Sequence, residues 1–175
     1  TRKYSGLTRC LRVFEITSCF LVKISFGQAN GRVTSLNVRA TATVTDNLNM
    51  LTIRNIDLVN PPVMQGTLEV SPITSEFAGM FKIMGSPGAR VRITYLQNEV
   101  IREYEEGIGE VSAEYILSAA FNDLQFQSAL LDVGEGVFPI GPDGELYVWL
   151  GANLDLTKAT PGVYLSEFII ELEYI

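Results

Sequence analysis

The 175-residue chain contains no histidine and only two cysteines, Cys10 and Cys19. Without an imidazole, the sequence lacks Ser-His and Cys-His catalytic pairs, histidine-ligated zinc sites and the usual proton shuttle near neutral pH. Because no cysteine follows residue 29, thiolate catalysis and cysteine-ligated metals are also excluded from the rest of the chain. We therefore expect no enzyme activity and no catalytic, cofactor-binding or metal-binding residues.

Carboxylate chemistry is what remains, since the chain has 20 Asp and Glu residues. Glycoside hydrolysis needs two opposed carboxylates about 5–10 Å apart. Most of these acids, however, occupy outward positions of predicted strands or the charged stretch 97–110, where a solvated surface is the simpler interpretation. The loops 132–135 and 143–145 offer oxygen ligands for calcium, but ordinary turn chemistry explains both.

No apolar run reaches the roughly 18 residues that suggest a membrane span. Residues 1–29 contain five basic residues and one acid, Glu15, and continue into the apolar stretches 19–22 and 24–29. This order, closed by Gly27-Gln-Ala29, predicts a signal peptide over residues 1–29; a first strand or a disordered tail is the alternative. We expect residues 30–175 to form one domain that is secreted, periplasmic or at the cell surface, without membrane insertion.

The formal net charge of the chain is −7, and removal of the basic segment 1–29 would make the remaining protein still more acidic. An acidic surface repels phosphate backbones and anionic lipids. Nucleic acids are therefore not expected as partners.

From Arg32 onward, short alternating or β-branched runs are separated by Gly, Pro, Asn and Asp clusters, as in all-β domains. The pattern predicts an immunoglobulin-like antiparallel β-sandwich of about nine strands, with a partly open barrel as the alternative. Residues 111–121 fit a strand or a short helix, and the all-β context favours the strand. Residues 124–131 are expected to form a strand, and residues 97–110 a solvated loop or a short irregular connection. Tyr147 and Trp149 lie on one face of a predicted strand and are assigned to the sandwich core, with an exposed sugar-stacking platform as the alternative.

The last fourteen residues alternate between two faces. One face carries the set Tyr164, Ser166, Phe168, Ile170, Leu172 and Tyr174, and the other carries Glu167, Glu171 and Glu173. A period of two predicts a half-buried strand. Such a strand can pair with another chain if its edge is open, or it can be the last strand of a complete domain.

Three segments together resemble an uncharacterised bacterial family of secreted, pilin-like β-sandwich domains, a domain of unknown function. They are Ala40-Thr-Ala-Thr-Val44, Leu146-Tyr-Val-Trp-Leu-Gly-Ala152 and Pro161-Gly-Val-Tyr-Leu-Ser-Glu-Phe168 with Tyr174. The resemblance spans roughly residues 36–175. Gly151-Ala-Asn-Leu154 departs modestly from the Gly-rich stretch of that family.

The C-terminal strand is also similar to the assembly motif of chaperone–usher pilin subunits, in which a glycine fourteen residues from the end and a penultimate tyrosine bracket an alternating strand. Gly162 and Tyr174 occupy these places. The resemblance implies a fimbrial subunit in which Tyr164, Phe168, Ile170 and Leu172 pair with a periplasmic chaperone or like subunits, and in which chaperone basic residues anchor the Ile175 carboxylate. The chain departs from this pattern in its short extension, Asn30–Leu36, and in having no disulfide after residue 29.

The sequence thus predicts a non-enzymatic secreted or cell-surface subunit that assembles through edge-strand pairing. A secreted binding module is the alternative. Such a module would be an adhesin-like monomer that binds a glycan or a protein through the loops at 97–110 or 132–143.

Overall fold

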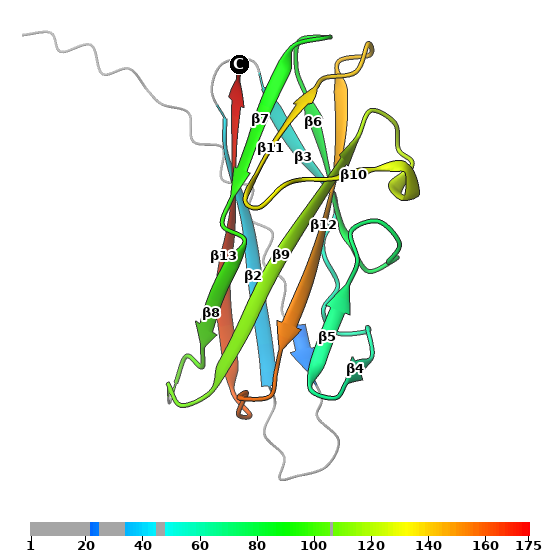
Figure 1. The fold of residues 1–175 in the computed structure, drawn as a ribbon. Helices are drawn as coiled ribbons and strands as arrows, with labels where there is room; N and C mark the ends of the chain where they lie inside the picture. The colour runs from blue at the N-terminus through cyan, green and yellow to red at the C-terminus, as the bar shows by residue number, and fades with distance from the viewer. Residues whose placement is uncertain (1–21, 25–33, 45–47, 106) are drawn as a thin grey trace, which may run out of the picture.

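A computed structural model describes residues 22–24, 34–44, 48–105 and 107–175, with the backbone alone for the first two ranges. Within these ranges there are thirteen strands and one 3-10 turn, η1 (Gln125–Gln127), and no α-helix. The strands form two facing sheets, so the predicted all-β sandwich is confirmed (Figure 1). No helix in the described part of the chain is long and apolar enough to cross a membrane.

The first sheet, sheet A, contains both the first described strands and the C-terminal strand. Its order is β1 (Val22–Ile24), β2 (Thr34–Val44), β13 (Val163–Tyr174), β7 (Arg90–Tyr95) and β11 (Glu135–Pro139). β13 pairs with β7 in antiparallel fashion but with β2 in parallel (Figure 1). This parallel ladder is a difference from the wholly antiparallel sandwich that we expected. Parallel neighbours need a long crossover, and here the rest of the domain provides it.

The second sheet, sheet B, is built around β12 (Glu145–Asp155). One edge of β12 pairs with β9 (Glu110–Ala120), and the other pairs first with β6 (Gly79–Met84) and then with β5 (Thr67–Val70). The outer strands are β3 (Asn49–Arg54) on β6, β4 (Val63–Met64) on β5, and β8 (Asn98–Arg102) and β10 (Ala129–Leu130) on β9.

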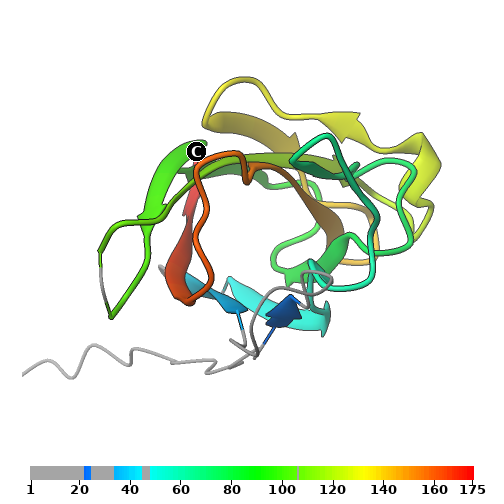
Figure 2. The same cartoon turned by 90° about the horizontal axis from the view of Figure 1, so that it is seen from below.

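The core lies between the two sheets, which curve around it when seen end-on (Figure 2). Every second residue of β12 belongs to this core: Leu146, Val148, Leu150, Ala152 and Leu154. The same alternation holds for β13, since side chains on opposite faces of a strand alternate. For β13, the hydrophobic period of the sequence therefore predicts the inward face correctly.

Trp149 is buried, with 1% of its surface exposed, but not in the sandwich core. It lies on the outer face of sheet B, where its ring stacks on Tyr147 at a centroid distance of 6.3 Å. Ser118 on β9 is the cross-strand neighbour of Trp149. The Ser118 Oγ donates a hydrogen bond to the Pro72 carbonyl and accepts one from Ser128 Oγ, so the segments that contain Pro72 and Ser128 lie over this part of the sheet. The assignment of Tyr147 and Trp149 to the sandwich core is wrong. Covering loops, which leave no periodic signal in the sequence, bury the tryptophan instead.

Three local predictions have different outcomes. Residues 111–121, for which the sequence favours a strand over a short helix, belong mostly to strand β9, so this prediction is confirmed. The expected loop 97–110 contains β8, whose alternation is weak because Ile101 is its only fully buried side chain. The expected strand 124–131 is mainly η1 and the two-residue β10, so this prediction is wrong. Its apolar residues Leu124, Phe126 and Leu130 stay exposed rather than facing the core.

Gly151 marks the place where the chain leaves β5 and passes over β12. A Cβ atom at this position would lie 2.3 Å from the Val70 carbonyl oxygen and 2.7 Å from the Pro72 nitrogen. These are backbone atoms, so relief requires the chain to shift, and overpacking of this kind costs about 1–3 kcal/mol. We predict that Gly151→Ala lowers the free energy of unfolding by about this amount. Urea denaturation followed by far-UV circular dichroism measures the change.

Ser112→Ala is the control for this substitution, because Ser112 is exposed on the same face of sheet B. Its free energy of unfolding should stay within about 0.5 kcal/mol of the unsubstituted protein. Equal stability of the two variants would contradict the close backbone approach at Gly151.

Candidate assembly site along the C-terminal strand

β13 contains most of the residues that the sequence nominates for assembly. Tyr164, Phe168, Ile170 and Leu172 point into the core, and each has no more than 2% of its surface exposed. The intervening side chains, including Leu165 and Ile169, face solvent on the outer side of sheet A. The half-buried strand that the period of two predicts is therefore present.

Phe168 is the centre of an aromatic cluster that joins the two sheets. Its ring lies 4.7 Å from the ring of Tyr115 on β9 and 5.8 Å from that of Tyr95 on β7, both in tilted arrangements. Tilted aromatic pairs contribute beyond the area that they bury. Phe168 thus links β13 to sheet B as well as to its own sheet.

The two C-terminal residues make specific backbone contacts. Tyr174 Oη accepts a hydrogen bond from the Ser86 amide at 2.8 Å, and the Ile175 amide donates to the Arg90 carbonyl at 3.0 Å. A Cβ atom on Gly85 would come 2.6 Å from the Tyr174 hydroxyl, so this turn needs glycine beside the tyrosine. The penultimate tyrosine therefore has an internal role in fixing the turn before β7, whereas the Ile175 side chain is half exposed.

Gly162 precedes β13 and packs against Glu103, a carboxylate with only 4% of its surface exposed. Glu103 Oε1 accepts hydrogen bonds from the amides of Glu105 and Val163, and Oε2 accepts one from the Gly107 amide. A Cβ atom on Gly162 would lie 2.3 Å from Glu103 Cγ. The glycine that the pilin resemblance singles out is thus needed here for close packing against a buried carboxylate.

The role of Glu103 could not be recognised from the sequence, because it lies in the charged stretch that we expected to be solvated. Its backbone forms an isolated antiparallel bridge with Tyr164, and the next amide, that of Tyr104, donates to the Val163 carbonyl at 2.7 Å. Nothing distinguishes it from the neighbouring glutamates in sequence. Only the folded arrangement shows that it fixes the start of β13.

A second polar group holds the middle of β13. Ser166 Oγ donates to Glu99 Oε2 and lies 3.1 Å from the Tyr115 hydroxyl. Burial raises the pKa of the Tyr115 phenol well above its ordinary value, so this group stays neutral and can act as a hydrogen-bond donor. These contacts satisfy the hydrogen-bonding capacity of the Ser166 hydroxyl, which lies on the apolar face of β13. They also connect β13 to β8 and β9.

β13 is an interior strand of sheet A. Along one edge, Val163–Leu172 pairs with Ser35–Val44 of β2. Along the other, Ile170–Tyr174 pairs with β7, and Tyr164 bridges to Glu103. The structure therefore places β2 of the same chain where the resemblance to pilins implies a partner strand.

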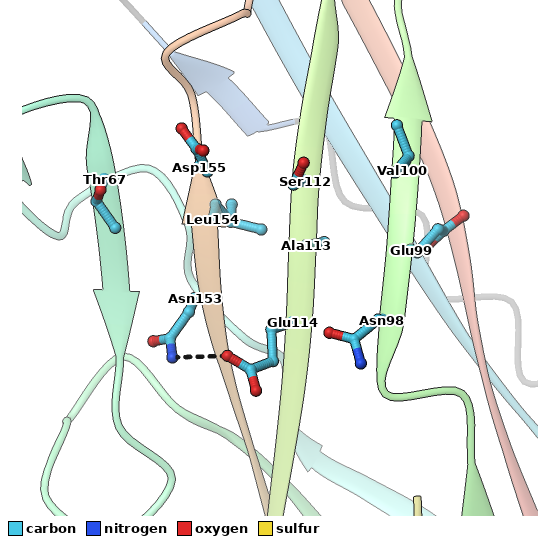
Figure 3. A pocket seen from close by; sticks show the side chains of 10 residues that line it. All are labelled: Thr67, Asn98, Glu99, Val100, Ser112, Ala113, Glu114, Asn153, Leu154 and Asp155. Carbon is cyan, nitrogen blue, oxygen red and sulfur yellow. Dashed lines mark hydrogen bonds between the residues drawn. The ribbon is translucent and has the colours of Figure 1, made fainter.

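A second candidate surface is a groove of about 350 Å³ on the outer face of sheet B (Figure 3). Two cross-strand rows line it: Asn98, Glu114 and Asn153, and next to them Val100, Ser112, Asp155 and Thr67. Glu114 accepts hydrogen bonds from Gln97 Nε2 at 3.2 Å and from Asn153 Nδ2 at 3.4 Å. None of the lining residues is basic or aromatic. Of the two loops that we expected to bind ligand, only 97–110 contributes to the groove, through β8.

No family model matches the chain, and no curated protein matches it significantly. The resemblance to pilin-like domains therefore stays a prediction, and any functional proposal rests on the geometry of the strands and of the groove.

Phe168 and its neighbour Ile169 offer a matched pair of substitutions on opposite faces of β13. Phe168→Ala removes a buried ring that contacts Tyr95 and Tyr115, and we expect a loss of about 3–5 kcal/mol in the free energy of unfolding. Ile169→Ala truncates a side chain that is 44% exposed and should cost less than about 1 kcal/mol. Urea denaturation followed by the fluorescence of Trp149, the single tryptophan, measures both. Equal losses would mean that β13 does not bury this face.

Glu103→Gln tests the buried carboxylate. The amide keeps the shape of the side chain but replaces one acceptor oxygen with a donor group, which then faces a backbone N–H. We expect a loss of about 1–3 kcal/mol in the free energy of unfolding. Glu105→Gln, at an exposed position two residues away, is the control and should be close to neutral. If the thermal midpoints of the two variants agree, Glu103 does not hold the start of β13.

Proposed function

We propose that the protein is a non-enzymatic structural subunit of a secreted or cell-surface, fimbria-like assembly, and that its copies assemble through strand pairing at sheet A. The observation that carries this proposal is the parallel ladder between β2 and β13. It joins the first long strand among the described residues to the C-terminal one. The outermost long strand on this side of sheet A is therefore an N-terminal segment.

The core residues of β13 explain why a strand must occupy this position. Tyr164, Phe168 and Ile170 are almost fully buried, although only β1 and β2 lie between β13 and the end of the sheet. Without a strand at the β2 position, these buried side chains of β13 would be exposed to solvent along the edge that β2 now occupies. A second copy of the chain contains the same strand sequence. Two chains can therefore pair here either by exchanging β2 or by adding to its outer edge.

A binding module is the second candidate function, and the groove of Figure 3 favours it. Its carboxamide, hydroxyl and carboxylate groups could donate and accept hydrogen bonds to a polar ligand. Such a module would act as a monomer with a closed fold.

The solution mass separates the two candidates. We predict that the full chain forms oligomers whose mass rises with concentration, measured by size-exclusion chromatography with light scattering. A synthetic peptide of residues 34–44 should compete for the same backbone groups and reduce this mass, whereas a scrambled peptide of the same composition should not. A single monomeric mass at every concentration would contradict the assembly proposal and favour the binding module.

A further inference from the structure

The outer edge of β2 is the longest strand edge in the described structure without a paired neighbour. β1 pairs only with Thr34–Leu36, and among the described residues no strand pairs with this edge over 37–44. Backbone N–H and C=O groups along such an edge can accept a further strand. We infer that a second copy of this chain adds to this edge, so that β2 remains on its own β13 and the two A sheets become continuous. This inference rests on the proposed function and specifies its contact.

Four other outer strands have features that oppose pairing. β3 has a bulge between Thr52 and Arg54, and β11 contains Gly136 and ends at Pro139. β4 and β10 span two residues each. Short length, bulges and proline are the usual means by which edges avoid association. By contrast, β2 is eleven residues long and has no proline, no glycine and a single charge, Arg39.

The partner is a second copy because the β2 edge can be self-complementary. Two identical strands that pair in antiparallel fashion are related by a two-fold axis, and directly opposed residues lie on the same face. If the two-fold axis passes between the Thr41 residues of the two copies, Ala40 of one copy lies opposite Ala42 of the other, and Val38 lies opposite Val44. Arg39 would then face Thr43 rather than the other Arg39, so like charges do not meet.

This register also matches the faces of the sheet. Positions 38, 40, 42 and 44 pair within the chain with Ser166, Phe168, Ile170 and Leu172, all on the core side. Thr41 pairs with the exposed Ile169, so its position belongs to the outer side. Core-side positions of one copy thus lie opposite core-side positions of the other. The paired positions 38–44 also do not include residues 34–36, which pair with β1.

The contact is isologous and closes after two copies. A dimer is therefore the expected unit, and a longer fibre would need a second, different contact. β1 lies within residues 1–29, the segment that the sequence predicts as a signal peptide. Its removal would free residues 34–36 as well and lengthen the available edge.

The test uses the full chain with Cys10→Ser and Cys19→Ser, so that an introduced cysteine is the only thiol. Directly opposed antiparallel residues have Cα atoms about 4.5–5.5 Å apart, within the range for a disulfide. We expect Thr41→Cys to form a covalent dimer under mild oxidation at least about ten times faster than Thr94→Cys, as measured on non-reducing gels. Thr94 is the matched control, because it lies on β7 between β13 and β11, away from any edge.

A second pair of variants does not depend on the register. Lysine on an edge strand disfavours pairing, so Thr41→Lys combined with Thr43→Lys should weaken dimerisation at least about tenfold relative to Thr94→Lys. Circular dichroism confirms that each variant is folded. Crosslinking of Thr41→Cys at the rate of Thr94→Cys, or unchanged dimerisation of the lysine variant, would overturn the inference.

The outcomes also separate this inference from the proposed function. If the unsubstituted chain forms oligomers but Thr41→Cys does not crosslink faster than its control, assembly stands and the β2 edge is not the contact. If the unsubstituted chain is monomeric at every concentration, both are overturned.

Discussion

The structure depends on the ladder between β13 and β2, because it places these two strands, far apart in sequence, side by side in one sheet. β13 supplies the buried row of Tyr164, Phe168, Ile170 and Leu172, and β2 covers its edge over ten paired positions. Hydrophobic burial drives the assembly of these strands, and the backbone ladder sets their register. A shift of one residue would turn the buried row of β13 towards solvent on the other face.

Polar groups support this strand from the opposite side. Glu103 fixes the beginning of β13, and Glu99 with Ser166 and Tyr115 fixes its middle. Buried polar groups are costly unless they are hydrogen-bonded, and each of these is satisfied by backbone amides or hydroxyls. The strand therefore has a defined position along its length, which apolar packing alone would specify less sharply.

The sequence predicts the long strands well and the covering segments poorly. β13 alternates over twelve residues between an apolar face and a face that carries glutamates, so its inward face can be read directly. Trp149 could not be placed, because an alternating strand does not reveal which of its two apolar faces looks inward when loops cover the other. Residues 124–131 are apolar enough for a strand, but the structure leaves Leu124, Phe126 and Leu130 exposed around η1. The contact between Gly162 and Glu103 joins residues far apart in sequence, and no local pattern indicates it.

The pairing of the first long strand with the last has a consequence for how the chain acquires its structure. Sheet A cannot be completed until β13 is available, since β13 lies between β2 and β7. Contacts between segments so distant in sequence slow folding, and domains rich in them expose unpaired strands for longer. During synthesis, β2 therefore stays unpaired with β13 until the residues between the two strands have been produced. We therefore expect sheet A to be completed only after β13 has been produced.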